Sequence, residues 1–569
     1  MKEHRPSLLL MEIRNMRHAF LFIIVVLALF LRLWQLDSVP PAPSLDEVSI
    51  GWNAYSIMKT GSDEYGTPFP LLLRAYDDWR PILYVYLVMP FVWLFGLTAV
   101  SVRLPSVILS VLSVVATYFL VKELLRDKMD KKEKVDRKEI TNYIALLAAG
   151  FVAISPWHIY ISRLGHEVNA GTAFLIFALL FFFRKSYILA SLFFSLSFMS
   201  YQSEKIIVPL VVISLALLFY KEMLQRKKQV ILAVILGMVI TIPFLFVSFQ
   251  PDALIRFKGT NILSANEQEF IDHAIKRKEA IEQGDLMGII RHNRRIVSVE
   301  IIAQQYFSHF NPNWLFINRG HEAHKVPHMG ILWIGEGVLL VIGLFALYKR
   351  YIPLRSGIVL LILILTASLP ASITTGAPHA MRSFTAVPAV QILAGVGAVF
   401  MYQSLGILGN LGIYVRKLSI GLLAILALFS IRAFYINYFY VFPQEQSDSF
   451  QYSLSRAISY VKEHEYQYDH IVFSNEDDLY QSYMFYLFNT KYDPEKYQKE
   501  GGTISGGYAE SHMFNKYEFR PIVWETEDKA DTILYIGNIH DFPETISPLE
   551  TIVRLNGEPS IAIVANPSL

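Results

Sequence analysis

The chain has 569 residues, of which 53% are hydrophobic and only 18% are charged, and its formal net charge at pH 7 is +2. Apolar runs of about 17–22 residues, long enough to cross a bilayer core, recur along the first three quarters of the sequence. The chain has no cysteine, which excludes disulfides, thiolate nucleophiles and cysteine-ligated metals. We therefore expect a polytopic α-helical membrane protein surrounded by membrane lipid, and no nucleic-acid partner.

The first apolar run, 18–34, follows basic residues that include Arg14 and Arg17. A short basic segment before an apolar run is also typical of a signal peptide. The sequence that follows, "QLDSVPPAPSLDE", has no convincing cleavage site with small residues. We therefore interpret this run as a permanent membrane anchor.

Charge in the loops predicts the topology. Loops enriched in Lys and Arg tend to lie on the cytoplasmic side of a membrane. The N-terminal segment is enriched in this way, and so are the loops 122–139, 183–186, 221–228, 348–355 and 415–417. We expect all of them to be cytoplasmic.

Counting the crossings creates a conflict, because spans at both 81–98 and 103–121 would place the basic 122–139 loop outside. Segment 81–98 contains Pro81 and Pro90, and a proline inside a helix kinks or breaks it. We therefore predict juxtamembrane or re-entrant helices within one external loop, 35–102. About eleven spans of sufficient length remain: 18–34, 103–121, 142–157, 168–183, 186–202, 204–220, 229–249, 331–348, 356–371, 383–402 and 418–438.

This topology predicts a membrane domain over 1–439 with further external segments at 155–167, 250–330 and 371–382. From residue 440 the composition becomes polar and aromatic. Strand-like runs such as "HIVFS" and "IAIVAN" alternate there with helix-like runs. We predict a small external α/β domain over 440–569, with the C-terminus outside.

The polar residues expected on the external side include acids, arginines and histidines. Ionisable groups at a membrane boundary are costly unless they pair or have a function. The ionisable residues expected on this side are Asp46, Glu47, Asp77, Asp78, Arg80, Arg103, Arg163, His166, Glu167, His321, His324, His328, His379 and Arg382. Tyr201 and Lys205 lie at an outer hairpin between two spans. Arginine forks match phosphate oxygens, and a carboxylate can take a proton from an attacking hydroxyl.

The motifs "SLDEVSIGWNAYSIMKTG", "YDDWRP" and "VRLPS" together resemble the first loop of GT-C glycosyltransferases of the protein O-mannosyltransferase and aminoarabinose-transferase superfamily. "SPWHIYISRLGHE" resembles the second loop of these enzymes, and "PHAMRSFTAVPAVQILAG" a late helix near the carrier phosphate. The resemblance covers about residues 18–402 and implies a polyprenyl-phosphate sugar as the donor. It also implies an integral membrane enzyme, which we place in the plasma membrane of a prokaryote.

The resemblance implies roles for individual residues. Asp46 matches the catalytic-base position, and Glu47 is a helper that orients Asp46 or the acceptor. Arg80 falls where relatives carry a basic residue that contacts the carrier phosphate, although "WRP" departs from the His-Pro-Pro form of the mannosyltransferases. Further phosphate candidates are Arg163, Arg382 and Arg103, and further substrate-binding candidates are Asp78, His166, Glu167, His328, Tyr201 and Lys205.

Structural interpretations of the same residues stay open at this point. Asp46 and Glu47 can cap the helix that begins near Ser44, and Arg103 can extend its head group to the interface. Asp77 is expected to have a structural role. The spacing of His321, His324 and His328 is compatible with zinc, but a fourth ligand is not evident, so we assign no metal site and leave a divalent metal open.

The leading hypothesis is an inverting hexosyl or pentosyl transferase that moves a sugar from a polyprenyl monophosphate to an acceptor hydroxyl on the outer face. The acceptor is a protein, a lipid or a glycan. Inversion converts a β-linked donor into an α-linked product. The alternatives are a transporter or flippase for a lipid-linked sugar, and an oligosaccharide transferase or ligase that uses a diphosphate-linked glycan. No cofactor is assigned.

Overall fold

The computed structural model describes residues 8–76, 78–126, 133–250, 262–318, 320, 322, 324–406, 409–504, 510–530 and 532–565. They form two compact units. Unit 1 comprises Met1–Arg32, Leu109–Ile161 and Val168–Phe434, and unit 2 comprises Leu33–Ile108, Ser162–Glu167 and Tyr435–Leu569. The first loop, 35–102, thus groups with the C-terminal region in unit 2. The boundary at 439/440 that composition suggests stays a prediction.

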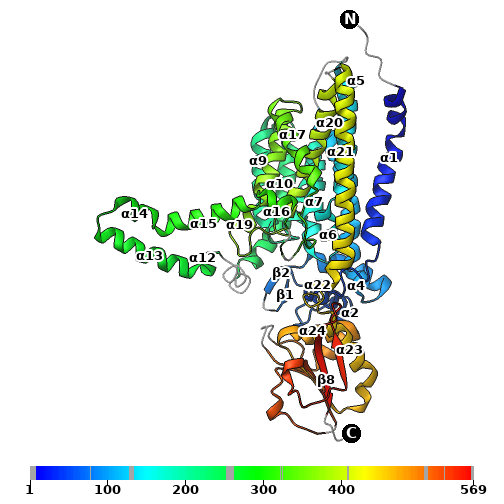
Figure 1. Cartoon of the computed structure of the whole chain (residues 1–569), viewed down its shortest axis with the longest axis vertical. Helices are drawn as coiled ribbons and strands as arrows, with labels where there is room; N and C mark the ends of the chain where they lie inside the picture. Colours follow the sequence, from blue (N-terminus) through cyan, green and yellow to red (C-terminus); the bar gives the residue numbers. More distant parts are fainter. Residues whose placement is uncertain are drawn as a thin grey trace. The chain divides into compact units, whose positions relative to one another are not determined.

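Unit 1 is helical, and its long helices run side by side as a bundle (Figure 1). Its membrane-type helices are α1 (Leu8–Leu33), α5 (Glu133–Ile154), α6 (Pro156–Ser162), α7 (Glu167–Phe183), α8 (Tyr187–Phe198), α9 (Glu204–Leu224), α10 (Lys227–Ser248), α17 (Ile334–Tyr348), α18 (Leu354–Ala367), α19 (Leu369–Ser372), η2 (Phe384–Ala386), α20 (Val387–Gly406) and α21 (Gly409–Ile436). Helix α4 (Ala99–Leu124) begins in unit 2 and continues in unit 1. Each of the eleven spans expected from the sequence coincides with one of these helices.

Among the described residues, seven helices are long and apolar enough to cross a membrane, and α5 with α6 adds an eighth if this pair, bent by 55°, is one span. The other expected spans correspond to the shorter apolar helices α7, α8 and α17, so the count of eleven stays a prediction. Helix α3 (Leu83–Phe95) contains Pro90. Its 13 residues do not distinguish it by length from α8, which has 12, so the juxtamembrane interpretation stays a prediction.

Helix α20 lies at the centre of unit 1, packed against α5, α17 and α18. Two glycines permit its contact with α17, because a Cβ added at Gly343 would lie 2.5 Å from the Leu393 carbonyl oxygen, and one at Gly397 would lie 2.0 Å from the Leu339 carbonyl oxygen. Small residues allow membrane helices to approach this closely. Helices α10 and α21, in contrast, leave most of their apolar side chains exposed, as helices in contact with lipid do.

Residues 262–308, within the segment 250–330 that the sequence predicts to be external, form a helical hairpin in unit 1 (Figure 1). It consists of α12 (Ile262–Ala265), α13 (Glu267–Glu282), α14 (Leu286–Arg291) and α15 (Arg294–Ser308), and α16 (Pro312–Phe316) follows it. Ile262, Val297 and Ile301 form its small buried core. Helix α15 is anchored on α19 of the bundle.

Unit 2 combines the first loop with the C-terminal α/β region. Its elements are α2 (Leu45–Thr60), β1 (Leu72–Ala75), β2 (Asp78–Pro81), α3, the start of α4, the π-helical turn η3 (Asn437–Val441), α22 (Phe442–Glu445), α23 (Tyr452–His464), η4 (Glu465–Gln467), β3 (His470–Phe473), η5 (Asp477–Leu479), α24 (Ser482–Thr490), α25 (Pro494–Lys499), β4 (His512–Phe514), β5 (Tyr517–Phe519), η6 (Trp524–Thr526), β6 (Ile533–Asn538), η7 (Ile539–Asp541), β7 (Glu550–Val553) and β8 (Pro559–Ala565). The predicted small α/β fold of the C-terminal region is confirmed.

The C-terminal sheet has six strands in the order β4-β5-β3-β6-β8-β7. Strand β3 runs parallel to both β5 and β6, and the other pairs are antiparallel. Helix α2 of the first loop packs on α24 and α25. The Trp52 ring meets the Tyr497 ring edge-on at 5.2 Å, and the Trp52 indole donates a hydrogen bond to the Tyr492 carbonyl over 3.4 Å. The C-terminal region therefore forms one side of the packing around α2.

The close contact of α17 and α20 predicts the effect of a larger side chain. Gly397→Val should lower the midpoint of thermal unfolding in detergent, because overpacking a helix contact costs about 1–3 kcal/mol. Gly421→Val is the matched control, since nothing lies within 4 Å of a Cβ added at Gly421 in α21. Equal midpoints for the two variants would contradict the packing of α17 on α20.

Candidate active site

The candidate site begins at the N-terminus of α2, where the sequence places two adjacent acids. Ser44 is the N-cap, and its hydroxyl accepts a hydrogen bond from the Glu47 amide, while the Ser44 amide donates to the Glu47 carboxylate over 2.8 Å. This reciprocal arrangement is a capping box, which satisfies two amides of the first turn. The structural interpretation of Glu47 as a capping residue is therefore correct. Asp46 takes no part in the box and is directed elsewhere.

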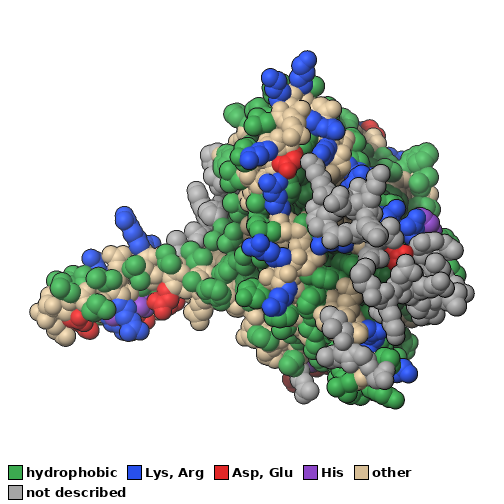
Figure 2. Space-filling view, turned by 90° about the horizontal axis from the view of Figure 1, so that it is seen from above, with side chains coloured by type: hydrophobic (Ala, Val, Ile, Leu, Met, Phe, Trp, Pro, Cys, Tyr) green, Lys and Arg blue, Asp and Glu red, His purple; other side chains and the backbone are tan. Residues whose placement is uncertain are grey.

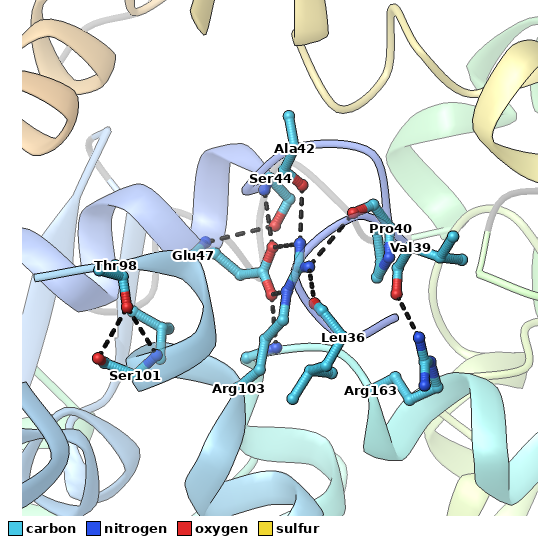
Figure 3. A network of polar contacts seen from close by, with 12 residues as sticks. Leu36, Val39, Pro40, Ala42, Ser44, Glu47, Thr98, Ser101, Arg103 and Arg163 are labelled. Atoms are coloured by element: carbon cyan, nitrogen blue, oxygen red, sulfur yellow. Dashed lines mark hydrogen bonds and ion pairs between the residues drawn. The ribbon is translucent and has the colours of Figure 1, made fainter. Parts of the chain in front are cut away.

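Glu47 also forms a buried ion pair with Arg103 of α4 (Figure 3). Both side chains are almost completely inaccessible to water, and the Arg103 Nε lies 2.8 Å from the Glu47 carboxylate. The remaining guanidinium N–H groups donate to Glu47 and to the carbonyl oxygens of Leu36, Pro40 and Ala42. A guanidinium has five N–H donors, and all five of these have acceptors within unit 2. Arg103 therefore holds the first loop in place, and these contacts favour a structural role over the expected contact with a phosphate.

The segment before α7 completes this network. The Gly165 amide donates to the Glu47 carboxylate over 2.7 Å, and a Cβ at Gly165 would lie 2.6 Å from Val102. Arg163 is fully buried and donates to the carbonyls of Gln35 and Val39 and to the Tyr438 hydroxyl. These contacts favour a structural role for Arg163 rather than the expected contact with a phosphate.

Asp46 lies in the middle of a chain of alternating charges. One carboxylate oxygen is 2.5 Å from Nη1 of Arg80, and the other is 3.4 Å from Nε2 of His166. The Nε of Arg80 is 3.2 Å from Asp78, which lies with Arg80 on strand β2. The side chain of Asp46 is 35% exposed, whereas that of Arg80 is 7% exposed. Asp46 is therefore the accessible acid of the cluster, and Arg80 is its buried cation. Asp77, expected to be structural, lies outside the described residues.

His166 and Glu167 extend the chain on the other side of Asp46, where Nδ1 of His166 is 3.2 Å from the Glu167 carboxylate. Burial lowers the pKa of His166, but Glu167 and Asp46 more than compensate, so the pKa lies above its ordinary value. For Asp46, burial raises the pKa, but the charge of Arg80 and the contact with His166 outweigh it and hold the pKa well below its ordinary value. Asp46 is therefore a carboxylate, and its position is set by two basic partners.

The other candidates from the sequence belong to unit 1. Arg382 donates to the Thr374 hydroxyl and the Thr375 carbonyl. Lys205 lies 3.3 Å from the Ser248 hydroxyl and above the Phe244 ring. Tyr201 is buried, and His328 has a left-handed backbone conformation, with φ 57°. The structure thus groups eight of the twelve candidates in unit 2, and the roles of these four stay predictions.

The spacing of the histidines in the long loop is compatible with zinc binding. His324 stacks on His379 with ring centroids 5.0 Å apart, and His321 lies outside the described residues. Within the described part of the chain, no group of three or more His, Cys, Asp or Glu side chains is arranged to hold a metal ion. The described residues therefore provide no metal site to which a step can be assigned.

Glu64 is a structural acid that sequence reasoning missed. It is fully buried and accepts hydrogen bonds from Asn53 of α2, from Tyr483 of α24 and from Thr503. Burial raises the pKa of Glu64 to about 7, against these hydrogen bonds. The sequence "TGSDEYG" resembles a solvated turn, and two of the three partners of Glu64, Tyr483 and Thr503, lie more than 400 residues away in the chain. Local sequence therefore contains no sign of this contact.

These elements define a polytopic helical membrane protein with a small α/β region and a charged cluster on the first loop. Its fold is similar to that of apo ArnT from Cupriavidus metallidurans, with a TM-score of 0.50 and 11% identity over 96% of this chain and 98% of that one. ArnT bound to undecaprenyl phosphate gives a TM-score of 0.46 at 11% identity, over 96% and 97% of the two chains. The Archaeoglobus fulgidus oligosaccharyltransferase in complex with Zn and sulfate gives 0.46 at 14% identity, over 83% of this chain and 61% of that one.

No protein-family model and no curated protein matches the sequence. The likeness to apo ArnT extends over almost the whole of both chains. It confirms the GT-C fold that the resemblance of the first loop predicted. At this level of identity the likeness establishes the fold alone.

The buried pair of Glu47 and Arg103 predicts a large loss of stability on its disruption. Arg103→Gln should reduce the free energy of unfolding by about 3–5 kcal/mol, because it leaves a carboxylate buried without its charged partner. Arg126→Gln is the control, because Arg126 is 78% exposed in its pair with Glu123 and such pairs contribute about 0–1 kcal/mol. Similar losses, measured by denaturant unfolding in detergent, would show that the Arg103 network does not hold unit 2 together.

The raised pKa of Glu64 predicts that the free energy of unfolding depends on pH. Its pKa is about 7 in the folded chain against 4.5 ordinarily, so the folded state binds more protons between these values and stability falls as pH rises through this window. Glu64→Gln should remove this decline and gain stability over the wild type above pH 7. The measurement is the difference between the unfolding midpoints of the wild type and the variant from pH 4 to 8. The contributions of all other titrating groups cancel in this difference. A constant difference would contradict the raised pKa.

Proposed function

We propose that the protein is a membrane glycosyltransferase that moves a sugar from a polyprenyl-monophosphate carrier to an acceptor hydroxyl. The GT-C fold supports the class of reaction. The observation that carries the proposal is the position of Asp46, an accessible carboxylate paired with a buried arginine at the start of α2. A base and a phosphate-binding cation are the two groups that such a transfer requires.

Asp46 is the base in this proposal. Its partners hold it ionised, and its exposure of 35% leaves room for a hydroxyl to approach. A carboxylate with a lowered pKa is a weak base, however, and the ideal catalytic pKa is near the working pH. The site therefore needs a change that raises the pKa of Asp46 when the donor is bound.

Arg80 supplies that change. Its planar guanidinium suits a phosphate oxygen as well as a carboxylate. A donor phosphate that pairs with Arg80 competes with Asp46 for the same charge, and weaker pairing raises the pKa of Asp46. The donor thus makes its own base stronger. His166, held between Asp46 and Glu167, keeps the carboxylate in position during this exchange.

The reaction step balances without an added reagent. The acceptor oxygen forms a bond to the anomeric carbon, and its proton passes to Asp46. The bond between the anomeric carbon and the phosphate oxygen breaks, and its electron pair remains on the polyprenyl phosphate, whose charge Arg80 neutralises. Attack from the side opposite the phosphate inverts the anomeric configuration. We assign Glu47, Arg103 and Arg163 to positioning, and the donor contacts of Arg382, Tyr201, Lys205 and His328 remain predictions.

The orientation we propose places the N-terminus in the cytoplasm and the C-terminal region outside, because the basic loops favour that topology. Figure 2 shows Lys and Arg side chains gathered on one end of the helical part, which supports it. A flippase and a diphosphate-dependent transferase are the alternatives. Product analysis separates the three, because only a monophosphate-dependent transferase releases free polyprenyl monophosphate while it forms a new glycosidic bond.

Asp46→Asn should reduce transfer by about 10²–10⁴-fold, because an amide cannot accept the proton. Binding of a labelled polyprenyl-phosphate sugar should persist, since Arg80 remains. Asp37→Asn is the control, because Asp37 is an exposed acid of the same loop and should retain full activity. The measurement is sugar transfer by the purified protein with donor binding assayed in parallel. Wild-type turnover by the Asp46 variant would refute its role as the base.

A further inference from the structure

A cavity of about 540 Å³ lies in unit 1 at the C-terminal end of α4, next to the start of α5 and the connection between α17 and α18. Its walls carry five basic side chains: Lys122, Arg126, Arg137, Lys138 and Arg350. None of these residues belongs to the group around Asp46, which lies in unit 2. The cavity is therefore separate from that group.

Among the described residues that line the cavity, basic side chains outnumber acidic ones. Glu123 is the one acid among these described residues. It already has two cationic neighbours, since its carboxylate lies 3.3 Å from Nη1 of Arg126 and 3.5 Å from Nε of Arg184. Basic side chains gathered around a concave surface create a positive potential that attracts an anion.

The floor of the cavity is apolar and well packed. It includes Leu125, Ile144 and Ile352, each at most 6% exposed. The wall is fixed by polar contacts as well, because the Ser356 hydroxyl of α18 donates to the Leu124 carbonyl of α4. A cationic rim above an apolar floor suits a ligand with an anionic head and an apolar body.

The topology rule alone explains why basic residues occur on this end of the bundle, but it does not explain their position around a cavity. The connection between α9 and α10 provides the comparison. Arg226, Lys227 and Lys228 there are exposed and do not line this cavity. The two clusters carry similar charge and differ in shape.

We propose that this cavity binds the phosphate-bearing head group of an anionic phospholipid, with the first part of its acyl chains on the apolar floor. Basic pockets between membrane helices on the cytoplasmic side bind such head groups by this chemistry. A hydrogen bond to a charged group is worth about tenfold in affinity. The bound lipid joins α4, α5 and the α17–α18 connection from one side.

The test uses the full-length protein in nanodiscs of phosphatidylcholine with or without phosphatidylglycerol. Bound lipid is counted by native mass spectrometry, and the midpoint of thermal unfolding is measured in each. The site variant is Arg137→Gln with Lys138→Gln and Arg350→Gln, and the control is Arg226→Gln with Lys227→Gln and Lys228→Gln. We expect phosphatidylglycerol to remain on the wild type and the control, and to raise their unfolding midpoints. The site variant should bind it at least about tenfold more weakly.

Three results would overturn the proposal. Equal losses in the two variants would mean that the lipid responds to general surface charge. Equal unfolding midpoints with and without phosphatidylglycerol, with no retained lipid, would mean that the cavity holds no head group. Inorganic phosphate that raises the midpoint as much as the lipid at the same concentration would assign the cavity to a free anion. Because no catalytic residue is changed, none of these results depends on the proposed transferase activity.

Discussion

The buried ion pair of Arg103 and Glu47 determines the geometry of the first loop. Neither the guanidinium nor the carboxylate has access to water. A buried ion pair is not in itself a source of stability, because desolvation offsets its attraction. Its importance here lies in what else the two groups bind. Arg103 holds three carbonyls of the segment 36–42, and Glu47 holds the start of α2 and the Gly165 amide. One pair thus brings together four stretches of chain.

This arrangement explains the different roles of two adjacent acids. Consecutive residues of a helix point in directions about 100° apart, so when Glu47 turns inward to Arg103, Asp46 faces Arg80 and His166 instead. The buried acid sets the orientation and the accessible acid is available for chemistry.

Much of the fold could be predicted from the sequence. Apolar length predicted the positions of the membrane helices, and the runs "HIVFS" and "IAIVAN" predicted β3 and β8. Strands β4 and β5 have three residues each, too few to show a period. In the candidate site, Asp46 and Arg80 were recognisable from motifs, whereas the structural roles of Arg103 and Arg163 were not. Those roles depend on backbone carbonyls, which have no sequence code.

The packing of α2 on the C-terminal region has a consequence for biosynthesis. The hydrogen bond between Trp52 and Tyr492 joins residues 440 positions apart. At about 5–20 residues per second, a ribosome needs on the order of 20–90 s to make the intervening chain. During this interval α2 has left the ribosome, but the C-terminal segments that pack against it have not yet been made. The packing of α2 therefore cannot be completed until Tyr492 has been translated, and a chain that stops earlier lacks this contact.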